Sequence, residues 1–488
     1  MRAVIEVKIL ESDPRTLYAL EWLLTAVGVP FRFVEQWHAP ALRVVCGSTS
    51  AGEECDLWMS AQGLTENDWR VRFADGLPLL YRGCAPAPEM FAKADRILVD
   101  LVGISFWLLV RREEQTYSNA LGNDRRFEGY RSLLYDVGLL QWPVLDHYVA
   151  RLRSIIDAKL RSRGEALLPI PPWPEGKQFA VILSHDVDRI QHTGWRECFL
   201  RVLRAFNRGL GPCERIFTLA GGVAQMGRAL SGITSSDDPL WNFDLWADLE
   251  DQFGFRSTFF VMALDGLGAV NDGGYRLYDQ VKFRGVRQPF RRVLRTLRRD
   301  GWEVGLHGSI DSHTDADMLT CQKARLEAAL SEPVLGVRQH HLMFRIPDTW
   351  QAQSEAGFQY DSTCGFNKRV GFRAGTGLPF QPYDEKLEKP FPVIEAPLVI
   401  QDGAIMGEEP TNIDQASTRC IRILENIKDA GGLGCLLWHP HVAHERRYSG
   451  WFQVYCNLLQ WIATQPAYVG PASEIVGHWI RRRQEVAL

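Results

Sequence analysis

The chain has 488 residues and a formal net charge of -4, and 46% of its residues are apolar while 23% are charged. This length suggests two domains, and the apolar content can fill substantial cores, which excludes a disordered chain. The slight negative charge lacks the basic excess of nucleic-acid-binding proteins, so we expect small molecules or glycans as partners and no nucleic acid.

Residues 1–168 are predicted to form a smaller, mixed α/β accessory domain. Strand-like runs at 4–9 and 42–46 alternate with a helical pattern at 15–26. This part of the chain contains no convergent set of His, Cys and carboxylate side chains that would indicate a site. We therefore assign the accessory domain no role beyond packing or substrate recruitment.

Two further helices are expected in this domain, over 92–111 and 144–161. The first contains the most apolar stretch of the chain, 97–110, which includes Asp100 and is too short to cross a bilayer. The first twenty residues mix charged with apolar side chains and lack the apolar segment of a secretion signal. We therefore expect no transmembrane segment and a cytoplasmic location.

A proline-rich segment, Leu168–Pro174, marks the predicted domain boundary. Its four prolines remove backbone donors and favour an extended connector to a second domain over 175–488. The ten cysteines never form a Cys-x-x-Cys pair, so reduced thiols are expected in place of a structural zinc site.

Short apolar strands alternate with amphipathic helices after the boundary. Buried strands are expected at 179–183, 258–262 and 304–306, and the spacing of Phe290, Val293, Leu294 and Leu297 predicts a helix between the last two strands. A further helix is expected from Thr314, with Asp317 completing a capping box, and another around 420–427. Serial strand–helix–strand units favour parallel strands, so we predict a complete or distorted (β/α) barrel.

Polar residues gather at the ends of four apolar runs, 179–183, 302–306, 335–337 and 434–438, and strand ends are where (β/α) barrels place their chemistry. Asp186 and Asp188 are two residues apart and can face one pocket. The other strand ends carry the side chains His307 with His313, Arg338 with His340, and His439.

His and Asp ligands of this kind hold a divalent ion such as zinc in catalytic sites that keep a position open for water. We predict one divalent metal ion, most readily zinc. A single histidine is more often an ordinary hydrogen-bonded residue, and we interpret His192, His341, His441 and His444 in that way. Recurrence at four strand ends favours a metal site for the others.

The stretch from Phe179 to about Pro440 resembles the polysaccharide deacetylase superfamily of carbohydrate esterases, whose members cleave N-acyl groups from sugars. The order of motifs is similar: two aspartates, a histidine pair, an arginine, and the Leu-x-His of Leu437-Trp438-His439. The segment Gly336–Phe344 is similar to a divergent bacterial branch that carries an extra amino-terminal domain.

The resemblance implies a catalytic base at Asp186, a general acid at His439 and an orienting Arg338. It implies metal ligands at Asp188 and His307 and a third at either His340, which we favour, or His313. Here Val187 separates aspartates that are usually adjacent, so the roles of base and ligand could be exchanged. Segments around Asp361 and Arg373 follow the arginine motif and are predicted to bind substrate at its rim.

The function implied is removal of an acetyl or formyl group from the nitrogen of an amino sugar, in surface polysaccharide biosynthesis. An amide hydrolase for a small non-sugar substrate is one alternative, and a catalytically inactive glycan-binding scaffold is another. Two features are interpreted as structural only. The arginines between 284 and 299 indicate a solvated helix face, and Trp241, Trp246 and Trp302 indicate core packing.

Overall fold

The computed structural model describes residues 4–38, 41–48, 53–61, 68–83, 85–116, 126–166, 169–190, 240–265, 272–407 and 412–488, with a few residues between 202 and 223. His192, Cys84, Cys198 and Cys213 lie outside the described residues. The other seven cysteines are free thiols. No helix in the described ranges is long and apolar enough to cross a membrane.

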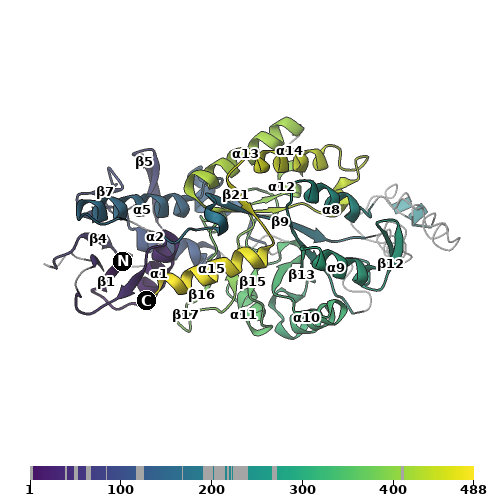
Figure 1. The fold of residues 1–488 in the computed structure, drawn as a ribbon, viewed down its shortest axis with the longest axis horizontal. Coiled ribbons are helices and arrows are strands. Elements are labelled where there is room, and N and C mark those ends of the chain that lie inside the picture. Colours follow the sequence, from purple (N-terminus) through teal and green to yellow (C-terminus); the bar gives the residue numbers. More distant parts are fainter. Residues whose placement is uncertain are drawn as a thin grey trace.

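The amino-terminal part is built on a sheet of order β2-β1-β3-β4-β8-β7 (Figure 1). Its strands, parallel except for β7, are β1 (Ile5–Ile9), β2 (Phe31–Phe33), β3 (Leu42–Gly47), β4 (Leu57–Ser60), β7 (Ala92–Lys93) and β8 (Arg96–Ile97). The helices α1 (Pro14–Val27), α2 (Leu101–Leu109) and α5 (Val144–Ser162) share one apolar core with this sheet. The strands and helices predicted at 4–9, 15–26, 42–46 and 144–161 are therefore confirmed.

The single helix predicted over 92–111 is wrong in its first part. Strands β7 and β8 form a tight antiparallel pair, with Ala94 in the left-handed region at φ 53°. Helix α2 begins only after Asp100, whose carboxylate accepts a hydrogen bond from the Gly103 amide. Apolar content alone did not reveal this cap, which ends the strand pair and starts the helix.

The second part is a distorted (β/α) barrel, as predicted. Its described parallel strands follow the order β18-β15-β14-β13-β10-β9-β20-β19, with β21 (Ala467–Val469) added beside β9, and β18 and β19 leave a seam between them. These strands are β9 (Phe179–Val187), β10 (Thr258–Val261), β13 (Glu303–Gly308), β14 (Gly336–Gln339), β15 (Tyr360–Asp361), β18 (Ile394–Glu395), β19 (Ile400–Gln401) and β20 (Leu433–Leu437).

Amphipathic helices pack against this curled sheet (Figure 1). They include α8 (Phe243–Gln252), α9 (Phe290–Arg299), α10 (Ala316–Leu330), α11 (Asp348–Glu355), α13 (Ile413–Ala430) and α14 (Trp451–Ala463). Helix α9 buries its predicted apolar stripe and exposes Arg292, Arg295 and Arg299, as expected of a solvated face. Trp246 and Trp302 are buried, and Trp241 is partly buried against the same core.

The capping box predicted at Thr314 and Asp317 does not form. Thr314 ends a short 3-10 turn, and the carboxylate of Asp315 accepts the amide hydrogen of Met318 at the start of α10. Asp315 is the N-cap residue of α10 because its backbone is extended, as is typical of an N-cap.

The two parts of the chain are in extensive contact. The predicted connector packs against both, since the Ile170 amide donates to the Gly28 carbonyl and the buried Trp173 donates to the Gly431 carbonyl. Helix α15 (Ala472–Val486) returns to the amino-terminal part (Figure 1). There Arg483 pairs with Glu21. One apolar core includes residues from both sides of the boundary, and the division at 168–175 stays a prediction.

Candidate metal-binding active site

Strand β9 places its two carboxylates on the same side of the barrel. The strand extends to Val187, so Asp186 lies within it and not after it, and residues 184, 186 and 188 alternate with 185 and 187. His185 points to the opposite side, where its Nε2 lies 2.7 Å from the buried Glu250. The residue between the two aspartates therefore keeps them on one face and directs His185 into the core.

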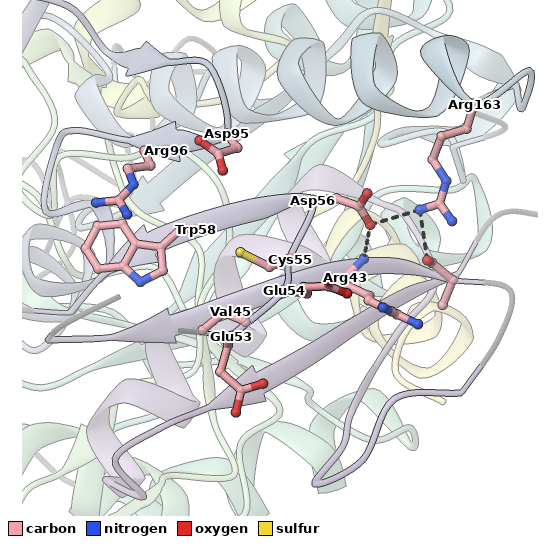
Figure 2. Close-up of a pocket in the computed structure, with 11 residues that line it drawn as sticks. Arg43, Val45, Glu53, Glu54, Cys55, Asp56, Trp58, Asp95, Arg96 and Arg163 are labelled. Carbon is pink, nitrogen blue, oxygen red and sulfur yellow. Dashed lines mark hydrogen bonds and ion pairs between the residues drawn. The ribbon is translucent and has the colours of Figure 1, made fainter. Parts of the chain in front are cut away.

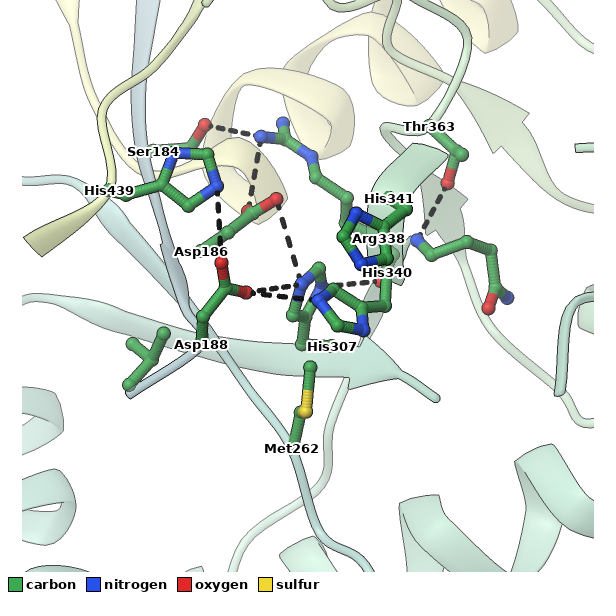
Figure 3. Close-up of polar contacts among 12 residues, drawn as sticks. Ser184, Asp186, Asp188, Met262, His307, Arg338, His340, His341, Thr363 and His439 are labelled. Carbon is green, nitrogen blue, oxygen red and sulfur yellow. Dashed lines mark hydrogen bonds and ion pairs between the residues drawn. The ribbon is translucent and has the colours of Figure 1, made fainter. Parts of the chain in front are cut away.

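Asp188 meets two histidines from neighbouring strand ends. Its Oδ1 lies 3.4 Å from Nε2 of His307 on β13 and 3.4 Å from Nε2 of His340, the residue that follows β14 (Figure 3). One ligand atom from each of these three residues lies within 4.8 Å of the other two. One carboxylate oxygen and two imidazole nitrogens form a donor set suited to a zinc-like ion.

The hydrogen bonds around these histidines fit a cation. Nδ1 of His307 lies 2.9 Å from the Arg338 carbonyl, and Nδ1 of His340 lies 3.0 Å from an oxygen of Asp272. Both contacts require the proton on Nδ1, which leaves each Nε2 as a lone-pair donor facing Asp188. Asp188 Oδ1 and His307 Nε2 are buried without a hydrogen-bond partner in the described residues. A cation bound between them would satisfy these facing lone pairs.

The charges around the group favour positive charge at this position. Burial raises the pKa of Asp188, but the nearby His307, His439 and His340 outweigh it and hold that pKa well below the ordinary value. Burial lowers the pKa of His307, and Asp186 and Asp188 more than offset it. The site thus stabilises an ionised carboxylate.

Asp186 is held by a buried arginine. Nη1 of Arg338 lies 3.3 Å from Oδ1 of Asp186 and donates to Ser184 Oγ at 2.9 Å. The rest of the guanidinium donates to the carbonyl and hydroxyl of Ser362, each at 2.8 Å, and stacks over Phe260. Oδ2 of Asp186 lies 3.9 Å from Nε2 of His307 and so faces the candidate metal position.

His439 approaches from the opposite side of Asp188. Its Nε2 lies 3.6 Å from Oδ2 of Asp188, while Asp402 holds its Nδ1 at 2.9 and 3.0 Å. Burial lowers the pKa of His439, but Asp402 and Asp188 raise it to about 10. The side chains of His439 and Asp188 are 19% and 22% exposed, against 1% for His307, so the group is open to solvent on the side of His439.

Three predicted residues are not brought into this group. His313 is in a 3-10 turn, where its Nδ1 lies 3.0 Å from the Ile310 carbonyl, and it lies outside the three-residue cluster. Arg373 and Asp361 do not lie at a substrate rim, which corrects that prediction. Arg373 is buried against both oxygens of Glu114, and Asp361 is buried with its carboxylate on Thr363.

Two orienting carboxylates were missed from the sequence. Asp402 directly follows β19, a two-residue strand too short to recognise, although its place after a strand end would have indicated it. Asp272 precedes two glycines in a loop, and no sequence pattern links it to His340. His341 stacks on His340 with ring centroids 4.0 Å apart but is outside the cluster.

Comparisons with known proteins match the chain at the level of one family model and several solved structures. A family of unknown function (DUF7033) matches residues 5–161. No curated protein matches the chain.

Several solved structures match about two thirds of the chain. One is a candidate polysaccharide deacetylase from Mycobacterium smegmatis, with 20% identity and a TM-score of 0.41, covering 64% of this chain and 93% of the other. The Puue allantoinase matches with 14% identity and a TM-score of 0.41, covering 64% and 94%. A candidate polysaccharide deacetylase involved in O-antigen biosynthesis from Bordetella bronchiseptica has 15% identity and a TM-score of 0.29, covering 64% and 93%.

Proposed function

We propose that the chain is a metal-dependent hydrolase that removes an acetyl or formyl group from the nitrogen of an amino sugar. The observation that carries the proposal is the convergence of Asp188, His307 and His340 between two proton-handling pairs, Asp186 with Arg338 and His439 with Asp402. Amide hydrolysis needs both a base for water and an acid for the departing amine.

Asp188, His307 and His340 would hold the ion. A divalent ion bound there would polarise the amide carbonyl and lower the pKa of a coordinated water toward neutrality. We favour zinc because the donor set mixes one carboxylate with two imidazoles.

Asp186 would take a proton from the attacking water. Its Oδ2 faces the metal position, whereas its Oδ1 is held by Arg338, whose positive charge favours the ionised carboxylate. Its side chain is only 4% exposed, so little bulk water competes for the proton.

His439 would donate a proton to the leaving nitrogen. The bond from Nδ1 to Asp402 fixes the ring so that Nε2 points to the open side of the group. Separate residues would then supply the base for the water and the acid for the departing amine. A place in surface polysaccharide biosynthesis and a cytoplasmic location stay predictions.

Acyl release from a panel of amides tests this proposal. Purified full-length protein loaded with zinc is incubated with N-acetyl and N-formyl amino sugars in free, nucleotide-linked and polymeric form, and with small non-sugar amides. We expect acetate or formate from at least one sugar, and none with Asp186→Asn. Release from the non-sugar amides alone would support the first alternative, and no release from any amide would support an inactive scaffold.

A further inference from the structure

The amino-terminal sheet carries a cleft that is separate from the metal centre. Its volume is about 540 Å³, and it lies over β3 and β4 at their junction with β8 and the end of α5 (Figure 2). Pockets that bind small molecules measure roughly 300–1,000 Å³. The cleft lies largely in the region matched by a family without an assigned function.

Strand alternation explains why this face of the sheet is polar. Val44 and Cys46 of β3 and Leu57 of β4 belong to the apolar core, so their neighbours along each strand point to the opposite face. Those neighbours include Arg43 and Trp58, which line the cleft. The sheet thus buries one face and presents a charged, partly aromatic surface on the other.

The cleft contains charges of both signs side by side. Its charged lining residues are Arg43, Arg96, Arg163, Glu53, Glu54, Asp56 and Asp95. Some are engaged, since Asp56 accepts from Arg163 at 2.9 Å and Glu53 pairs with Lys8 at 2.7 Å. Within the described residues, Glu54, Asp95 and Arg96 form no ion pair, and their polar groups stay available to a ligand.

This mixture of charges restricts the ligand class. A simple anion would be repelled by the carboxylates, and a simple cation by the guanidiniums, so neither a phosphate nor a polyamine fits well. A sugar hydroxyl both donates and accepts hydrogen bonds and is matched by carboxylates and guanidiniums that alternate around it.

An aromatic surface completes the pattern. The Arg96 guanidinium lies 5.3 Å from the Trp58 ring centroid, which keeps that planar donor over the indole. The Trp58 Nε1 has no hydrogen-bond partner among the described residues. The partly exposed Trp58 supplies apolar contact area for the C–H face of a sugar ring.

We propose that this cleft is a saccharide-binding site that holds a neutral or amino sugar unit away from the metal centre. The inference rests on the cleft's own lining and does not depend on hydrolysis at Asp188. It gives the amino-terminal part a function in glycan recognition.

Cys55 provides a readout confined to the cleft. It lines the cleft and is partly exposed, whereas Cys321 on α10 is exposed elsewhere and serves as an internal control. The rate of iodoacetamide labelling at each thiol is measured by peptide mapping in full-length protein, with and without the β-1,4-linked tetramer of N-acetylglucosamine. Sodium sulfate and spermidine are the charged comparators.

We expect the tetramer to slow labelling of Cys55 about tenfold at ten times its Kd, by mass action, and to leave Cys321 unchanged. The double variant Glu54→Gln, Asp95→Asn should lose this protection while retaining release of acyl groups from a monosaccharide. Each variant is compared only with itself, with and without ligand, because the substitutions alter the reactivity of the thiol.

Three results would overturn the proposal. They are labelling of Cys55 that no concentration of tetramer slows, equal protection by sulfate or spermidine, and protection that persists in the double variant. None of them bears on the metal centre, so failure here is distinct from failure of the proposed hydrolysis.

Discussion

Asp402 binds the Nδ1 of His439 with both carboxylate oxygens, at 2.9 and 3.0 Å, and also accepts the His439 backbone amide at 2.7 Å. Burial raises the pKa of Asp402, but His439 outweighs it and lowers that pKa below the ordinary value. The carboxylate therefore stays ionised and fixes both the tautomer and the orientation of the imidazole.

Replacing Asp402 by Asn tests whether this orientation matters for proton donation. The substitution keeps the shape but removes the charge that stabilises a protonated His439. We expect kcat to fall by about a hundredfold or more, with metal content and KM unchanged, because loss of acid–base catalysis costs 10²–10⁴-fold. Steady-state kinetics on the best substrate of the panel measure this, and an unchanged kcat would remove His439 from the acid role.

The two aspartates of β9 should be separable by experiment. Asp186→Asn should retain metal and lose turnover, since Asp186 lies against Arg338 and outside the three-residue cluster. Asp188→Asn should lose metal affinity. Metal analysis of the two purified variants decides the matter, and the reverse pattern would mean that base and ligand are exchanged.

Much of the barrel could be predicted because its strands are buried on both faces and its helices carry regular apolar stripes. The run at 179–183 and the stripe from Phe290 to Leu297 both became elements of the expected kind. Two-residue strands such as β18 and β19 were not predicted, because so short a segment shows no periodicity of apolar residues. Their positions depend on pairing with β15 and β20.

The centre of the site could be predicted for a similar reason. Parallel strands end at one rim, so polar residues after different strands meet there. The carboxylates that orient the site histidines could not be predicted in the same way. Asp272, for example, contacts His340 although the two residues are 68 positions apart in the sequence. Arg373 was misassigned because its counterion, Glu114, belongs to the other part of the chain.

Arg373 should contribute to stability and not to substrate affinity. It donates to both oxygens of Glu114, at 2.9 and 2.6 Å, and to the Gly365 carbonyl at 2.8 Å. Removing one partner of a buried ion pair costs roughly 3–5 kcal/mol, so Arg373→Met should lower the free energy of unfolding by about that amount. Urea denaturation measures the change.

Arg345→Met is the matched control, because the Arg345–Asp348 pair is largely exposed and should contribute at most about 1 kcal/mol. A raised KM with unchanged stability in Arg373→Met would instead restore the substrate-rim prediction.

Asp146 should make stability depend on pH. Burial raises its pKa to about 7 from an ordinary value of 3.8, although hydrogen bonds from Thr376 and Gly377 lower it in part. Between about pH 4 and pH 7 the folded chain thus keeps a proton on Asp146 that the unfolded chain has released. The contribution of Asp146 to the free energy of unfolding therefore falls as pH rises through that window and levels off above it.

The variant Asp146→Asn is neutral throughout this range and serves as the reference. The Tm of the native chain relative to this variant should fall from pH 4 to pH 7 and then stay level. A difference in Tm that is constant with pH would show that Asp146 is ionised in the folded protein.

Zinc titration of the metal-free protein tests the central claim most directly. The native chain and His313→Ala should each bind one zinc ion per chain with the same affinity, because His313 lies outside the cluster. His340→Ala should bind far more weakly, since it removes one of three ligands whose Nε2 atoms and carboxylate face one position. Failure of the native chain to bind zinc, manganese or cobalt, or loss of affinity in His313→Ala with none in His340→Ala, would contradict the account.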